Sequence, residues 1–189
     1  MIPILIAGPA LEPVSLAEAK AWLRIDGSDE DALISTLVTS ARLVLEAHTH
    51  QLFLEQSWKI LYDAWPSGGA LKIPLTPFMS LEALQVYDAS GVASDVSASM
   101  FVLDASPQGA RIAFTEPPPE PGRKIAGIEM RIRAGFGASA ANVPAPLRQA
   151  ILMLAARWFE NRGDAATDAT ALPVEIAALV NPFRRMRLA

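Results

Sequence analysis

One stretch near the end of the chain constrains the fold more than any other. It runs from Pro146, which suits a first helical turn because its missing N–H costs nothing there, to the natural stop at Gly163. Its apolar residues recur at spacings of three and four and form one stripe: Leu147, Ile151, Leu154, Ala155 and Trp158. Three further apolar residues widen this stripe: Leu152, Met153 and Phe159. So wide a stripe predicts a helix that packs on two sides. We expect it to be the central helix of the fold.

Two further helices are predicted near the N-terminus. Ser15 and Glu18 match the capping-box pattern and open a short helix that ends at about Leu23. Acidic residues 29–31 favour the start of a second helix, where the macrodipole stabilises negative charge, and this helix should end near His48. The two predicted apolar stripes are Leu16, Ala19, Trp22 and Leu23, and then Ile34, Leu37, Val38, Ala41 and Leu45.

From Glu55 onward the pattern changes to alternation, with many aromatic and β-branched residues. Short strands are predicted within 57–62, 71–73, 84–87, 101–103, 111–114 and 128–133. In the last of these, Ile128, Met130 and Ile132 should face the core, and Glu129, Arg131 and Arg133 should face the other way. Regularly spaced short strands indicate a small antiparallel sheet or barrel.

A last short helix should open at Leu172-Pro173 and close at Pro182. The sequence therefore predicts the α+β class, with a helical bundle built from N- and C-terminal segments. We expect one domain over residues 1–189, with helices in about 14–48 and 145–181, an antiparallel β-rich insertion at about 55–135, and a tail at 182–189.

Composition excludes several classes of protein. The chain has no cysteine, so it has no disulfide framework, thiolate nucleophile or Cys-based metal site. Its formal charge of −4 argues against a broad basic face for a nucleic-acid backbone. The apolar opening 1–7 is too short to span a membrane, and no uninterrupted apolar run elsewhere approaches 18 residues, so we expect no membrane association.

The candidate chemical motifs have simpler structural interpretations. His48 and His50 are the only histidines, too few for zinc without cysteine, and they suit a helix terminus. The acids at 26 and 29–31 lack the register of a calcium loop and suit helix capping. Gly135-Phe136-Gly137 lacks the third glycine of a dinucleotide loop. We therefore expect no enzyme, no cofactor and no metal.

The basic and apolar tail is the best candidate for a binding segment. Three arginines could pair with acids on a protein partner while three apolar residues act as anchors, although a solvated tail is the alternative. The tail residues are Phe183, Arg184, Arg185, Met186, Arg187 and Leu188. Weaker candidates for subunit or partner contacts are Arg148, Arg157 and Glu160.

Several motifs together resemble phage head-to-tail connector proteins, in particular the adaptor subfamily with a β-rich insertion found in prophages and gene transfer agents. The opening motif is Pro13-Val14-Ser15-Leu16-Ala17-Glu18-Ala19-Lys20. It is followed by Asp29-Glu30-Asp31, Trp58 and its strand, Ile73-Pro74-Leu75-Thr76-Pro77-Phe78, Val86-Tyr87-Asp88-Ala89-Ser90-Gly91 and Arg133-Ala134-Gly135-Phe136-Gly137. The closing motifs are Val143-Pro144, Trp158-Phe159-Glu160-Asn161-Arg162, Leu172-Pro173 and Pro182-Phe183-Arg184.

This resemblance implies a structural protein made in the bacterial cytoplasm and placed in the neck of a virion or gene transfer agent particle. It implies a homo-oligomeric ring, expected to be a dodecamer, between the portal protein and a stopper or tail-terminator protein. DNA would pass through the central channel without specific binding. The resemblance also implies that the C-terminal segment binds the portal, and it supplies no catalytic residues.

Two other functions compete with this interpretation. The first is a small-molecule binding module on the β-rich middle, with a cavity lined by Trp58, Tyr62, Tyr87 and Phe101. The second is a hydrolase that uses only aspartate and glutamate. Aromatic residues in short strands belong to the core more often than to a pocket, which disfavours the first alternative.

Overall fold

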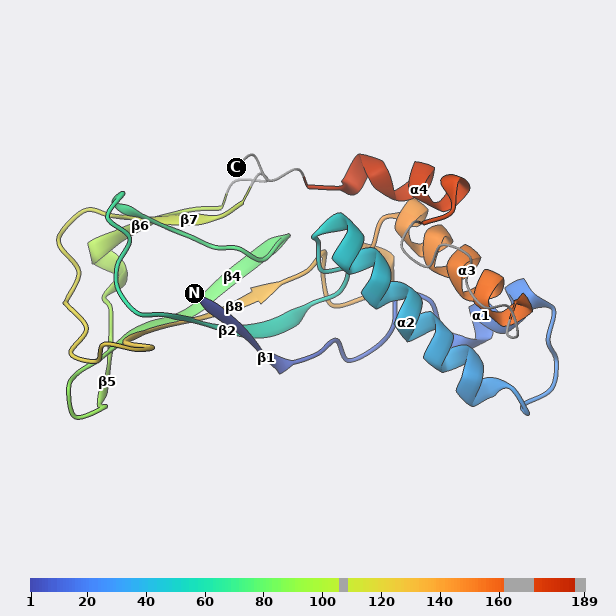
Figure 1. Ribbon diagram of the computed structural model, residues 1–189, viewed down its shortest axis with the longest axis horizontal. Helices are drawn as coiled ribbons and strands as arrows, with labels where there is room; N and C mark the ends of the chain where they lie inside the picture. The colour runs from blue at the N-terminus through green and yellow to red at the C-terminus, as the bar shows by residue number, and fades with distance from the viewer. Residues whose placement is uncertain (106–108, 162–171, 186–189) are drawn as a thin grey trace. The chain divides into compact units, whose positions relative to one another are not determined.

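The computed structural model describes residues 1–105, 109–161 and 172–185. The chain divides into two compact units, each built from two stretches of sequence. The β unit comprises Met1–Pro9 and Glu55–Phe136, and the helical unit comprises Ala10–Leu54 and Gly137–Ala189. Figure 1 shows the two kinds of element, helices and antiparallel strands, segregated in this way. The predicted α+β class is confirmed.

The helical unit contains α1 (Leu16–Leu23), α2 (Asp31–Thr49), α3 (Ala145–Glu160) and α4 (Val174–Val180), with short 3-10 turns at Ala140–Asn142 and Asn181–Phe183. Helix α3 is central, as predicted, because it packs against the three other helices (Figure 1). Its buried residues are Leu147, Ala150, Ile151, Leu154 and Ala155. None of the four helices of the described chain is long and apolar enough to cross a membrane.

Helix α1 begins with the predicted capping box. The Glu18 N–H donates to Ser15 Oγ over 3.1 Å, and the Ser15 N–H donates to Glu18 Oε2 over 2.8 Å. The predicted apolar stripe of this helix is only partly correct. Ala19 is buried, but Trp22 is 47% exposed. The helix has only eight residues, little more than two turns, so few of its side chains can be buried against its neighbours.

The β unit contains two antiparallel sheets, where the sequence predicted one sheet or a barrel. The larger sheet has the order β1 (Ile2–Ala7), β2 (Gln56–Tyr62), β8 (Ile128–Ala134), β4 (Phe78–Tyr87) and β5 (Ala93–Asp95). The smaller sheet has the order β3 (Ala70–Lys72), β7 (Arg111–Phe114) and β6 (Phe101–Asp104), preceded by a 3-10 turn at Ala98–Met100. The sequence did not predict β1 or β5.

Strand β8 lies at the centre of the larger sheet. Met130 stands between Ile60 of β2 and Leu84 of β4 in the strand register, and all three side chains are buried. The inward alternation predicted for β8 is therefore correct. Glu129, Arg131 and Arg133 lie on the other face, as predicted, but Glu129 is only 3% exposed there. Neighbouring polar side chains cover this carboxylate, as described below.

Candidate interaction surfaces

The segment after α4 is attached to the C-terminal end of α2. Gln51 Nε2 donates to the Phe183 carbonyl, and the Arg185 N–H donates to the Thr49 carbonyl over 3.0 Å. His50 follows the last residue of α2 and caps it with a left-handed φ of 56°, so the Thr49 carbonyl has no partner within the helix. The free Thr49 carbonyl at the helix end and the Gln51 side-chain amide therefore hold the first residues of the predicted tail.

The structure describes half of the predicted tail site. Phe183 and Arg185 are partly buried, whereas Arg184 is exposed. The other three residues, Met186, Arg187 and Leu188, lie outside the described residues. The described part thus consists of an anchored main chain that presents one exposed guanidinium at Arg184.

Arg148 makes its contacts inside the helical unit. Its Nε donates to the Pro13 carbonyl over 3.0 Å, and its Nη2 donates to Glu18 Oε1. The pKa of Glu18 lies below its usual value, chiefly because the Ser15 N–H and hydroxyl donate to it, with a further contribution from Arg148. Arg148 therefore connects α3 to the start of α1, a contact that the sequence did not reveal.

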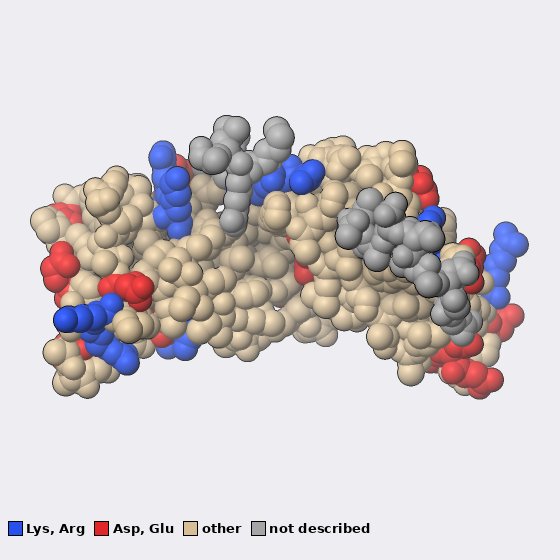
Figure 2. Space-filling view, viewed as in Figure 1, with Lys and Arg blue, Asp and Glu red and all other residues tan. Residues whose placement is uncertain are grey.

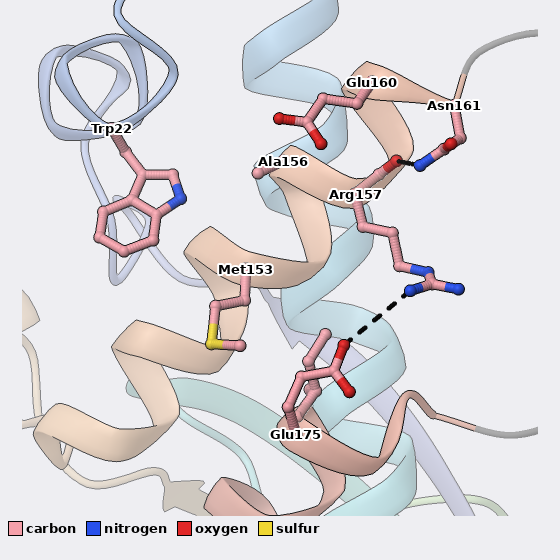
Figure 3. A pocket seen from close by; sticks show the side chains of 8 residues that line it. Trp22, Met153, Ala156, Arg157, Glu160, Asn161 and Glu175 are labelled. Atoms are coloured by element: carbon pink, nitrogen blue, oxygen red, sulfur yellow. Dashed lines mark hydrogen bonds and ion pairs between the residues drawn. The ribbon is translucent and has the colours of Figure 1, made fainter.

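Arg157 and Glu160 line an open hollow on the helical unit, shown in Figure 3. Arg157 Nη1 lies 3.9 Å from Glu175 Oε1 on α4, and the Trp22 indole and Met153 give the hollow an apolar side. Its full lining is Trp22, Met153, Ala156, Arg157, Glu160, Asn161, Glu175 and Ile176. Sequence reasoning found two of these residues but missed Trp22, which it had assigned to the core.

Helix α2 presents an uncharged face to solvent. Between Ala32 and Thr49, all of which are described, the exposed residues are Ala32, Ser35, Thr36, Leu43, Val44 and Ala47. The two charged residues of this stretch, Arg42 and Glu46, are buried and paired with each other. A surface helix usually carries charged residues on its outer side. The exposed face of α2 is therefore compatible with contact to another protein surface.

The β unit contains a cluster of charged and polar side chains around Glu129, and these side chains supply the hydrogen bonds that its carboxylate accepts. The Tyr87 hydroxyl donates to its Oε2 over 2.9 Å, Arg131 Nε donates to its Oε1 over 2.7 Å, and Lys59 Nζ lies 3.9 Å away. The hydrogen bond to Glu129 raises the pKa of Tyr87. Each carboxylate oxygen thus has a partner within the chain, which is typical of a structural cluster.

The aromatic residues of the proposed ligand cavity do not converge. Tyr62 donates to the Lys72 carbonyl, Trp58 donates to Gln56, and Phe101 packs edge-on against Phe114. A hollow on this unit is lined by Trp65, Pro66, Gly69, Phe114, Thr115, Glu116, Pro117 and Pro118, which include none of the four residues predicted for the cavity. The geometry therefore gives no support to the small-molecule alternative.

Other predicted motifs have structural explanations. Gly135 and Gly137 have φ angles of 141° and 153°, which favour glycine, so this motif satisfies a backbone requirement. His48 Nε2 lies 3.3 Å from Asn181 Oδ1 at the end of α2, as expected for a helix terminus. Among the described residues, no three His, Cys, Asp or Glu side chains are grouped to hold a metal ion. The face drawn in Figure 2 carries acidic and basic residues in small, separate groups.

The chain is similar to a known protein family and to chains of solved structures. Residues 13–74 match the family model described as phage gp6-like head-tail connector protein. The whole chain is similar to a chain from the neck of an empty gene transfer agent (GTA) particle computed with C6 symmetry, with 27% identity and a TM-score of 0.85. The match covers 100% of this chain and 98% of that one. The resemblance to head-tail connector proteins is confirmed.

Further structures extend this connector resemblance. The chain is similar to one in the neck of a native GTA particle computed with C12 symmetry, with 27% identity, a TM-score of 0.81 and coverage of 100% and 98%. It also matches a chain of the virion of a native GTA particle, with 27% identity, a TM-score of 0.82 and the same coverage. No curated protein sequence matches. The family match includes α1, α2 and β2, and the structural matches include the β unit, so a structural connector role fits both units.

Proposed function

We propose that this chain is a structural connector that forms a ring in the neck of a tailed phage or gene transfer agent particle. The observation that carries the proposal is the full-length similarity to a GTA neck chain, with a TM-score of 0.85. In this proposal the whole chain, residues 1–189, acts as one connector domain, and the β-rich segment at about 55–135 is an insertion within it. The role is one of assembly, without a chemical reaction.

The ring consists of copies of this chain around a channel for DNA. The similar neck structures were computed with C6 and C12 symmetry, which supports a twelvefold ring. A closed ring needs heterologous contacts, in which one face of each copy meets a different face of the next. The formal charge of −4 suits a channel through which DNA moves, because DNA adheres to broad basic surfaces.

The ring connects the portal protein on one side to a stopper or tail-terminator protein on the other. We assign the portal contact to the tail, Phe183 to Leu188. The hydrogen bonds of Gln51 and Thr49 support this assignment because they fix the point at which the tail leaves the helical unit. Arg184 is exposed there and can pair with an acidic residue of the portal.

The test is reconstitution with a purified portal assembly, followed by electron microscopy of the product. The first variant ends after Arg185, so it keeps the main-chain anchor to α2 and removes only residues 186–189. The second variant is Arg184→Glu, which reverses one exposed charge. Lys124→Glu is the matched control, because it makes the same charge change at an exposed position of the β unit.

We expect the wild-type chain and Lys124→Glu to form a ring on one face of the portal. The truncated chain and Arg184→Glu should bind the portal more weakly, by about tenfold or more for a contact with a charged partner. If the wild-type chain forms no ring on the portal, the connector proposal fails. If the ring forms equally well with both variants, the connector role stands and the tail assignment fails.

A further inference from the structure

Strand β1 is an apolar edge strand whose two faces are both open. It forms one edge of the five-stranded sheet, next to β2 (Figure 1), and all six of its residues are exposed. The side chains of Ile2, Ile4, Leu5 and Ile6 are 40–57% exposed. No charged side chain occurs before Glu12. This strand therefore offers unpaired backbone groups and apolar side chains together.

The register shows that β1 is apolar on both of its faces. Ile4 stands opposite Lys59, so it lies on the sheet face that carries the charged cluster, whereas Leu5 stands opposite Trp58 on the other face. Edge strands of monomeric proteins are usually protected by charged residues, prolines or bulges. Here Pro3 and a register shift between Leu5 and Ala7 are present, but charge is absent. Pro3 and the register shift confine the free edge to the stretch around Ile4 and Leu5, and this uncharged stretch can still pair with another strand.

A ring of identical copies restricts what can cover this edge. If β1 paired with β1 of a second copy, the contact would be isologous and would give a closed pair of subunits. A ring instead requires β1 to meet a different element of the next copy. Among the described residues, β6 is the only other sheet-edge strand that exposes large apolar side chains, because Val102 is 58% exposed and Leu103 is 37% exposed.

The remaining edges of the β unit fit less well. Strand β5 is three residues long and exposes Ser94 and Asp95, a polar and charged edge of the kind that resists strand addition. Strand β3 is equally short, and its one large apolar residue, Leu71, is buried. Strand β6 ends at Asp104, but this carboxylate is paired with Arg111 of β7. Strands β1 and β6 are therefore the two edges that expose large apolar side chains, and they are different elements, as a heterologous contact demands.

We infer that β1 of each copy pairs with β6 of the neighbouring copy and so connects the β units around the ring. This inference rests on the proposed ring. Strand addition supplies main-chain hydrogen bonds, and the side chains of both strands lose their exposure to water. The contact uses the β unit and is separate from the portal contact assigned to the tail.

The first experiment uses Ile4→Glu in the full-length chain. Because position 4 stands opposite Lys59, the new carboxylate gains a cross-strand partner and the isolated subunit should keep its circular dichroism spectrum and melting temperature. Ring assembly of this variant should require a protein concentration at least about tenfold higher than that of the wild type, because a charge now lies at the apolar contact. Val92→Glu is the control, since Val92 is an exposed apolar residue in the turn before β5.

The second experiment exploits the absence of cysteine from the chain. The double variant Ile4→Cys/Val102→Cys, assembled into rings and treated with a flexible bismaleimide, should give a ladder of covalent oligomers. Each single variant should remain monomeric under the same treatment, because each contact then holds only one thiol. The wild-type ring, imaged on the portal as above, reports the proposed function independently of these reagents.

The outcomes separate the two proposals. Rings that form without any cross-linked ladder, or that form equally well with Ile4→Glu, overturn the β1–β6 contact and leave the connector role intact. Dimers from Ile4→Cys alone would show an isologous contact and also overturn it. Normal rings of Ile4→Glu that lose their stopper or tail protein would assign β1 to that partner instead. Absence of wild-type rings on the portal overturns both proposals.

Discussion

Arg42 and Glu46 lie one turn apart on α2, and Arg42 Nη1 donates to Glu46 Oε2 over 2.9 Å in the interior of the helical unit. Arg42 Nε also donates to Glu12 Oε2 over 2.7 Å. The other oxygen of Glu46 accepts the Phe53 N–H over 2.7 Å. One buried guanidinium and one buried carboxylate thus connect α2 with the segments that precede α1 and follow α2.

We predict that Arg42→Met lowers the free energy of unfolding by about 3–5 kcal/mol, because it leaves the buried carboxylate of Glu46 without its counter-charge. Urea unfolding followed by circular dichroism measures this loss. The double variant Arg42→Met/Glu46→Gln should lose less, since the amide is neutral and its oxygen can still accept from Phe53. Equal losses in the single and double variants would contradict this explanation.

Gly137 opens the return of the chain to α3, and we predict that Gly137→Ala destabilises the helical unit by about 1–3 kcal/mol. Its φ is 153°, and an added Cβ would lie 2.5 Å from the Asn142 side chain. Gly27→Ala is the matched control, because an added Cβ there meets nothing within 4 Å. Thermal melting compares the two variants, and similar melting temperatures would show that the backbone at Gly137 is not restrictive.

The sequence predicts those parts of the fold that depend on local pattern. The capping box of Ser15 and Glu18 and the wide stripe of α3 were found because their residues interact at spacings of three and four. Strand β1 was not found, because its apolar residues do not alternate with polar ones. Its strand conformation depends on pairing with β2, more than fifty residues away in the sequence.

The candidate site residues were likewise predictable only where a local sequence pattern identifies them. The composition of the tail identifies Arg184, but the attachment of Phe183 to Gln51 depends on the ends of two distant helices. The burial of Glu129 was missed, because strand alternation assigns a face but does not tell which neighbours cover it. Trp22 was misassigned because an eight-residue helix buries only a narrow stripe.

The lowered pKa of Glu18 predicts a contribution to stability that depends on pH. A depressed pKa means that the folded state favours the carboxylate, so this contribution is complete above about pH 4.5 and is lost as the pH falls through the folded-state pKa. We expect Glu18→Gln to be less stable than wild type at neutral pH and to approach it in acid. Urea titrations across this range measure the difference, and two parallel curves would contradict the prediction.

The two tyrosines predict a second dependence on pH, in the alkaline range. Burial raises the pKa of Tyr62 to about 12, and the hydrogen bond to Glu129 raises that of Tyr87. A raised pKa means that the folded state favours the neutral phenol. The contribution of Tyr62 to stability is therefore complete below about pH 10, the pKa of an unfolded tyrosine, and is lost as the pH rises toward 12.

The variant Tyr87→Phe isolates this effect, because the chain has only two tyrosines and Tyr62 then gives the whole phenolate signal. Ultraviolet absorbance of the folded variant should show a midpoint near 12, whereas the same variant in concentrated urea should titrate at about 10. The difference follows from the burial of Tyr62 in β2, and its hydroxyl also donates to the Lys72 carbonyl of β3. A folded-state midpoint of about 10 would mean that the Tyr62 ring is open to water and that the two sheets separate at this edge.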